Sequence, residues 1–113
     1  MNESKPVEFR GSALDDLRAF PVSARRAAGY QIDLVQRGED PDDWKPMCTV
    51  GSGVREIRVK ADDGTFRVIY VAKFARTIHV LHCFQKKSQK TNLLDIALAQ
   101  KRYREILREF HHE

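Results

Sequence analysis

One stretch of the sequence, residues 54–91, constrains the fold more than any other. Its segments are rich in β-branched and aromatic residues, and turn signals separate them at Asp63-Gly64 and Ala75-Arg76. This pattern predicts a three-stranded antiparallel meander. The predicted strands are residues 54–60, 66–74 and 77–85. In the second strand both faces are apolar, which is typical of a central strand that helices cover on one side and that is partly covered on the other.

The positive charge of the chain is concentrated in the same stretch. It holds nine basic and three acidic residues, a net +6, whereas the whole chain carries +4. The basic residues are Arg55, Arg58, Lys60, Arg67, Lys73, Arg76, Lys86, Lys87 and Lys90. A basic surface of this kind favours an anionic partner.

The remaining composition indicates one domain, 1–113, of a soluble globular protein. A chain of 113 residues with 42% hydrophobic and 32% charged residues is large enough for one modest core. No apolar run approaches the roughly 20 residues that a membrane helix requires, and the N-terminus does not resemble a secretory signal. Cys48 and Cys83 have neither metal-ligand spacing nor the pattern of a disulfide framework. We therefore expect a cytoplasmic protein without metal, cofactor or membrane contact.

Helical signals flank the predicted sheet. A short strand over residues 7–10 precedes a helix that begins at Ser12, and a second helix follows over about 22–37. Residues 39–46 form an acidic, turn-rich loop, and a final helix begins after Asn92. The predicted buried stripe of that helix is Leu93, Ile96, Tyr103, Leu107 and Phe110. Helices and an antiparallel sheet in this order predict an α+β fold.

The alternation of side chains along a strand decides which cations meet. Arg58 and Lys60 share one face of the first strand, whereas Arg55 points to the other. In a hairpin centred near Asp63, Lys60 lies close to opposite Arg67. Like charges at that distance repel unless an acid or a bound anion lies between them. A conflict of this kind is typical of a functional site.

Lysines after the third strand extend this set. Lys86, Lys87 and Lys90 precede the last helix and can reach back over the sheet. A phosphodiester held by lysines and arginines gains charge-assisted hydrogen bonds, and arginine forks stabilise a pentacoordinate phosphate. The alternative is that these lysines only protect an exposed sheet edge. His82 is the candidate general acid or base, although a strand histidine is more often a hydrogen-bonded core residue.

The residues that carry these arguments resemble a known family. The segments GTFRVIY at 64–70 and FQKK at 84–87, with Thr91 just beyond and LDIALAQKRYRE in the last helix, are similar to the RelE/ParE toxin superfamily. The most similar group is the phage-derived, HigB-like branch of type II toxin–antitoxin toxins, over about residues 5–110. The resemblance implies a RelE-like fold akin to small microbial ribonucleases. In that fold two N-terminal helices pack on a small twisted antiparallel sheet with a C-terminal helix.

The resemblance also implies a ribosome-dependent mRNA endonuclease that cleaves by attack of the ribose 2′-hydroxyl on the adjacent phosphate. By match, Arg58 and Lys60 fall at first-strand cations of such members, Arg67 at a central-strand arginine and Lys87 at a basic residue after the last strand. We expect Arg67, Lys87, Arg58, Lys60 and His82 to be catalytic, and Arg55, Lys86 and Lys90 to bind RNA phosphates. Some nuclease members carry an acid or base near the chain end, but here His111 and His112 lie beyond the match. Either His82 or a lysine must then act as the acid or base, or catalysis rests on charge stabilisation alone.

The expected partners are mRNA on the ribosome and a cognate helix-turn-helix antitoxin, with DNA contacted only through the antitoxin complex. The ParE branch shares the fold but inhibits DNA gyrase without cutting RNA, and a non-toxic nucleic-acid-binding module is a further alternative. The cation cluster favours RNA chemistry over a gyrase contact. A basic surface also suits an acidic antitoxin segment.

Overall fold

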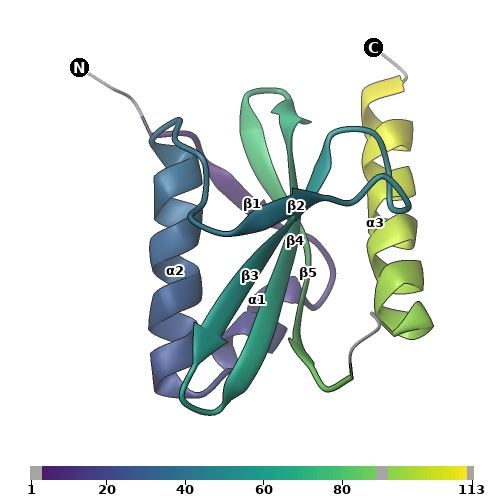
Figure 1. The fold of residues 1–113 in the computed structure, drawn as a ribbon. Helices are drawn as coiled ribbons and strands as arrows, with labels where there is room; N and C mark the ends of the chain where they lie inside the picture. Colours follow the sequence, from purple (N-terminus) through teal and green to yellow (C-terminus); the bar gives the residue numbers. More distant parts are fainter. Residues whose placement is uncertain (1–3, 89–91, 112–113) are drawn as a thin grey trace.

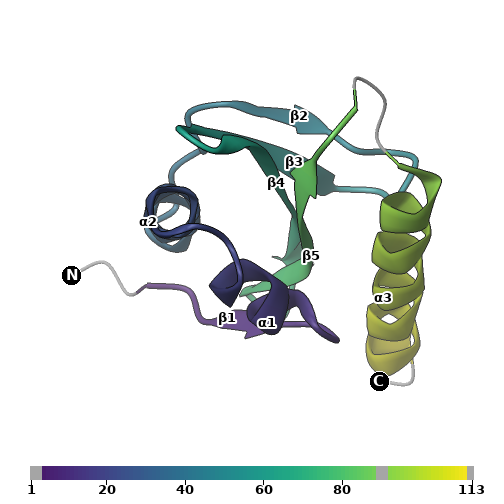
Figure 2. The same cartoon turned by 90° about the horizontal axis from the view of Figure 1, so that it is seen from below.

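A computed structural model describes residues 4–88 and 92–111 of the chain. It has an α+β fold in three layers, with α1 and α2 on one face of a sheet and α3 on the other (Figure 1, Figure 2). The elements are β1 (Val7–Phe9), α1 (Ala13–Arg18), α2 (Val22–Gln36), β2 (Trp44–Pro46), β3 (Val54–Ala61), β4 (Gly64–Phe74), β5 (Thr77–Lys86) and α3 (Leu93–His111). Among the described residues, no helix has both the length and the apolar character needed to cross a membrane.

The sheet has five strands in the order β1-β5-β4-β3-β2 and is mixed rather than wholly antiparallel as predicted. Strands β3, β4 and β5 form the predicted antiparallel meander. Its second hairpin closes through Ala75 and Arg76 at φ of 52° and 56°, the left-handed pair that a tight two-residue turn requires. β1 pairs with β5 in the parallel direction. β1 can run parallel to β5 because α1 and α2 lie between β1 and the meander in the chain, so no tight turn forces an antiparallel pair.

A short edge strand replaces part of the loop predicted over residues 39–46. β2 pairs antiparallel with β3 and places Trp44 opposite Ile57. The prediction was wrong here because acidic and proline-rich turn signals surround only three strand residues, which are too few to show an alternation of their own. Pro46 is tolerated because the strand lies at the edge of the sheet.

The first core cluster lies between the sheet and the two N-terminal helices, as the resemblance to the RelE/ParE superfamily implies. Leu17 and Phe20 are buried there, and the ring centroid of Phe20 lies 4.7 Å from that of Phe66. Ala24 and Ala28 of α2 are fully buried, so their small side chains allow α2 to pack closely on the sheet. The sheet contributes Ile57, Val59, Val68, Tyr70, Ile78 and Val80 to this cluster.

The second core cluster lies between α3 and the opposite face of the sheet. Ile69 and Val71 of β4 point into it, as predicted for a strand with two buried faces. From α3 it holds Ala99, Tyr103 and Ile106, with Ile96 and Phe110 partly buried. Two residues of the predicted stripe fall outside, because Leu93 is 80% exposed and Leu107 is 41% exposed. Leu107 lies about 100° around the helix from Ile106, and Leu93 precedes the turn at which α3 reaches the core.

Candidate nucleic-acid interface

Side chains on the α3-facing side of the sheet form rows that cross the strands. The register defines three of them: Lys60–Thr65–Lys86, Arg58–Arg67–Phe84 and Glu56–Ile69–His82. Neighbouring strands lie about 4.8 Å apart and successive rows about 7 Å apart. α3 packs against β5 on this side of the sheet (Figure 2). The cations of the first two rows therefore come from three different strands and lie within a few side-chain lengths of one another.

The register corrects one predicted contact. Arg67 lies opposite Arg58, and Lys60 lies opposite Thr65, whereas the sequence predicted Lys60 opposite Arg67. The hairpin closes with Ala61 opposite Gly64, so its centre lies one residue earlier than predicted. Gly64 has a φ of 134°, a conformation that favours glycine. The predicted conflict between like charges is present, but it involves two arginines.

Lys86 and Lys87 complete the cluster from the end of β5. Thr65, Arg67, Lys86, Lys87 and Ser88 line a shallow open depression of about 450 Å³. We call Arg58, Lys60, Arg67, Lys86 and Lys87 the basic patch. These are five of the predicted site residues, and the structure brings them onto one side of the molecule. Lys90, predicted to join them, lies outside the described residues.

The two arginines of the basic patch repel each other. Burial lowers the pKa of Arg67, and the neighbouring charge of Arg58 lowers it further, while Glu56 and Asp43 act in the opposite direction. An arginine nonetheless stays charged in a protein. The paired guanidinium groups therefore hold a concentrated positive charge at this row, and two nearby carboxylates moderate it.

These two carboxylates were not assigned to the site from the sequence. Nε of Arg67 lies 3.4 Å from Oε1 of Glu56, whose side chain is fully buried. Nε of Arg58 lies 3.2 Å from Oδ1 of Asp43, and its backbone N–H donates to the Asp43 carbonyl at 2.8 Å. The alternation of side chains along the strand could have assigned Glu56 to the site, because Glu56 shares a strand face with Arg58. Asp43 had no such signal, because it precedes the edge strand that the sequence did not predict.

The carboxylates leave most of the patch unpaired. Lys45 Nζ lies 3.7 Å from Oε1 of Glu56, so this acid is shared between two cations. Across residues 4–88 and 92–111, Lys60, Lys86 and Lys87 have no carboxylate partner. An open sheet face with paired arginines and unpaired lysines is suited to bind the backbone of a nucleic acid.

The model of the phage-derived Gp49-like proteins matches residues 15–104. The chain belongs to this family. Gp49-like proteins are a RelE/HigB-like toxin family, which agrees with the resemblance of the sequence to the RelE/ParE superfamily at this coarser level. No curated protein matches the sequence. The matched range includes the whole basic patch and both carboxylates that contact its arginines.

His82 of this Gp49-like chain shares the sheet face with the basic patch, but α3 encloses its ring. Nε2 lies 2.7 Å from Oδ1 of Asp95, and Nδ1 lies 3.4 Å from Nη1 of Arg102. Because a guanidinium can only donate, Nδ1 is the acceptor and Nε2–H donates to Asp95. The ring also stacks on Phe84, with centroids 5.1 Å apart. Both nitrogens are engaged, so His82 fastens α3 to β5, and its predicted role as acid or base requires these contacts to break.

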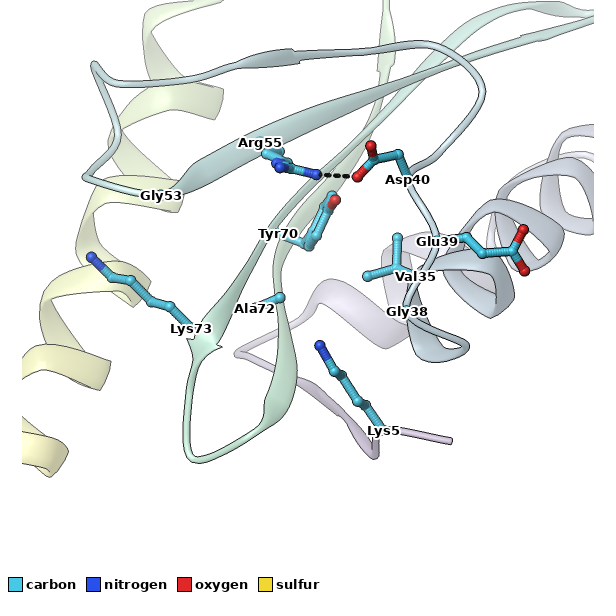
Figure 3. Close-up of a pocket in the computed structure, with 10 residues that line it drawn as sticks. All are labelled: Lys5, Val35, Gly38, Glu39, Asp40, Gly53, Arg55, Tyr70, Ala72 and Lys73. Atoms are coloured by element: carbon cyan, nitrogen blue, oxygen red, sulfur yellow. Dashed lines mark hydrogen bonds and ion pairs between the residues drawn. The ribbon is translucent and has the colours of Figure 1, made fainter. Parts of the chain in front are cut away.

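Arg55 lies on the opposite face of the sheet from the basic patch. It forms an ion pair with Asp40 at 3.0 Å, and its guanidinium carbon lies 3.9 Å from the centre of the Trp44 ring. Figure 3 shows this pair beside Tyr70 at a hollow of about 280 Å³. Burial raises the pKa of Tyr70, so its phenol stays neutral. The predicted RNA contact of Arg55 therefore lies apart from the basic patch, because the period of two along β3 keeps Arg55 away from Arg58, as the alternation predicted.

Other reactive groups lie away from the basic patch. Burial raises the pKa of Cys83 to about 12, so this thiol stays protonated in the first core cluster. Within the part of the Gp49-like chain that the structure describes, no three histidine, cysteine or acidic side chains gather closely enough to hold a metal ion. The chemistry that the basic patch itself offers is binding and charge stabilisation of phosphate.

Proposed function

We propose that this protein is the toxin of a type II toxin–antitoxin pair, of the HigB-like branch, and that it cleaves mRNA on the ribosome. One observation supports the proposal most directly. Arg58 and Arg67 lie side by side on a sheet face, and Lys86 and Lys87 extend the same face beside an open depression. Membership of a RelE/HigB-like toxin family is consistent with this activity.

The proposed reaction is a transesterification within the RNA strand. The ribose 2′-oxygen forms a bond to phosphorus while the bond from phosphorus to the 5′-oxygen breaks. The products are a 2′,3′-cyclic phosphate and a 5′-hydroxyl. Negative charge grows on the phosphoryl oxygens in the transition state, and the guanidinium groups of Arg58 and Arg67 stabilise it by charge-assisted hydrogen bonds. Loss of one well-placed donor of this kind typically costs about 10²–10³-fold in rate.

One proton leaves the 2′-hydroxyl in this reaction and one reaches the departing 5′-oxygen. The ammonium groups of Lys60 and Lys87 carry protons to donate, and both side chains are exposed. We assign them the donation to the 5′-oxygen, while solvent on the open face accepts the proton of the 2′-hydroxyl. His82 would take part only after leaving Asp95 and Arg102.

The proposed partner is a helix-turn-helix antitoxin that contacts promoter DNA together with this toxin. An antitoxin segment with acidic side chains would neutralise the unpaired lysines of the basic patch and exclude RNA from it. Charge complementarity of this kind speeds association and gives specificity.

Induced expression in a bacterium, followed by mapping of the 5′ ends of cellular mRNA, tests the proposal. We expect translation to stop within minutes and new 5′-hydroxyl ends to arise inside translated reading frames. Arg58→Ala removes a half-exposed arginine of the basic patch and should abolish both effects. Arg26→Ala is the matched control, because it removes the same charge from the exposed side of α2, on the other face of the sheet.

The competing activities give different results in the same experiment. A DNA-damage response with translation intact would support the gyrase inhibitor and contradict the ribonuclease. Growth without arrest would support a non-toxic nucleic-acid-binding module. Arrest by Arg58→Ala equal to that of the wild type would remove the basic patch from the mechanism.

A further inference from the structure

The two arginines of the basic patch are held in the same way. In each case a carboxylate oxygen approaches Nε: Asp43 lies 3.2 Å from Arg58 and Glu56 lies 3.4 Å from Arg67. The carboxylates come from different parts of the chain, one before β2 and the other on β3. The same contact on the same atom of two adjacent side chains indicates that the two carboxylates have the same role.

Contact at Nε leaves other donors of the guanidinium for a ligand. A guanidinium has five N–H groups in a planar fork, and a phosphate is recognised by two of them side by side. In the described residues, the terminal nitrogens of Arg58 have no protein partner. Nη1 of Arg67 donates to the Phe66 carbonyl at 3.2 Å, which leaves Nη2 without one. The carboxylates therefore contact each fork by an ion pair at Nε and leave terminal nitrogens without a protein partner. The Arg67 side chain is only 8% exposed, and it reaches the surface at the depression that it lines.

From this geometry we propose that Asp43 and Glu56 are positioning residues that aim the forks of Arg58 and Arg67 at a single RNA phosphate. The inference rests on the proposed function, since it concerns the phosphate that the basic patch would hold. Without the two carboxylates, the adjacent guanidinium groups would turn apart, because like charges this close repel each other.

Stability does not explain either carboxylate. Both oxygens of Glu56 are buried and neither accepts a hydrogen bond from any described residue. A buried ion pair with such geometry is no more stable than a well-packed apolar pair. Asp43 and Arg58 are half-exposed, and exposed ion pairs contribute little to folding. Breaking the Glu56 pair by changing one partner is costly, but an apolar pair in its place would serve stability as well. An arrangement that stability does not require is expected at a functional site.

The alternative is that the two acids merely reduce the positive charge of the face. The two explanations predict opposite signs. If the acids only reduce the charge, then Asp43→Asn and Glu56→Gln make the face more positive and should strengthen RNA binding. If the acids position the arginines, the same changes should weaken binding in spite of the added positive charge.

Fluorescence anisotropy with a labelled 2′-O-methyl oligoribonucleotide, which cannot be cleaved by 2′-hydroxyl attack, measures this directly. We expect Asp43→Asn and Glu56→Gln each to weaken binding about fivefold to tenfold, the scale of one disrupted charge-assisted hydrogen bond. The negative slope of log K against log salt concentration should become shallower by about 0.7 for each lost phosphate contact. Asp43→Glu, which retains a carboxylate, should restore most of the affinity.

Asp62→Asn is the matched control. It removes the same charge from the exposed loop of the β3–β4 hairpin, where Asp62 contacts no arginine. We expect this variant to bind as tightly as the wild type or more tightly. Thermal unfolding of each variant identifies any loss of fold. If Glu56→Gln unfolds, Asp43→Asn still tests the inference, because the Asp43 side chain is 49% exposed.

The outcomes separate the inference from the proposed function. If Arg58→Ala weakens binding while Asp43→Asn and Glu56→Gln strengthen it as Asp62→Asn does, positioning is refuted and the RNA-binding face remains. If the wild type does not bind the oligoribonucleotide, or Arg58→Ala binds as tightly as the wild type, the basic patch is not an RNA site. The proposed function and the inference then fail together.

Discussion

Replacing Arg67 by methionine should cost this protein much of its stability, and a second substitution should restore it. The side chain of Glu56 is fully buried, and Arg67 is its nearest cation, with an exposed fraction of only 8%. Methionine keeps most of the volume of the arginine but removes its charge. Glu56 would then remain buried with only Lys45, at 3.7 Å, as a partner.

The structure sets the size of the effect. Breaking a buried ion pair typically costs 3–5 kcal/mol, because a charge is left without compensation. Lys45 remains near Glu56, so we expect the lower end, about 3 kcal/mol. At about 4 °C per kcal/mol for a domain of this size, the melting temperature should fall by about 12 °C.

Changing Glu56 to glutamine in the same chain removes the uncompensated charge. The double variant Glu56→Gln/Arg67→Met should therefore recover to within about 1 kcal/mol of the wild type, which is about 2 kcal/mol more stable than Arg67→Met alone. Arg37→Met is the control, because its pair with Asp33 is half-exposed and should contribute less than about 1 kcal/mol.

Urea unfolding followed by the fluorescence of Trp44, the single tryptophan, measures these free energies, and circular dichroism gives the melting temperatures. Unchanged stability in Arg67→Met would refute the buried pair, as would a double variant no more stable than Arg67→Met. The double variant also has a functional use. It lacks the guanidinium but keeps the fold, so a loss of toxicity in it reports on chemistry rather than on unfolding.

Three further predictions concern the packing that supports the patch. Gly51→Ala should destabilise the fold by about 1–3 kcal/mol in urea unfolding, because an added Cβ would lie 2.3 Å from the Tyr103 ring; wild-type stability would show that the ring yields. Ile106→Ala should cost about 2–5 kcal/mol and Leu107→Ala far less, since the first is fully buried and the second is 41% exposed; equal costs would contradict the docking of α3. Burial and the charge of Arg10 lower the pKa of His79 from 6.5, so its neutral form contributes stability that is complete above pH 6.5 and is lost as the pH falls through the lowered folded pKa. The melting temperature of the wild type should accordingly fall more steeply between pH 7 and 5 than that of His79→Gln, and equal slopes would contradict this.

Much of the site could be predicted because the direction of a side chain along a strand is a local property. Arg58 and Lys60 share a face, and Arg55 lies on the other, whatever the strand packs against. The sequence predicted Lys60 instead of Arg58 opposite Arg67, a difference of two residues along β3, because a hairpin register depends on where the turn closes. Glu56 was not assigned to the site from the sequence, although the same alternation places this acid on the face of Arg58 and Lys60.

The sequence by itself determined the meander, its two faces, the helices and the concentration of positive charge on one sheet. These follow from the periodicity of side chains and from turn residues, which act over a few positions of the chain. Only the tertiary structure decided that Asp43 reaches Arg58, that α3 covers the His82 ring, and that β1 joins the sheet in the parallel direction. Each of these contacts joins segments that are not neighbours in the sequence, and the pairing of strands or the packing of a helix on the sheet, which no local pattern specifies, sets the distance between them.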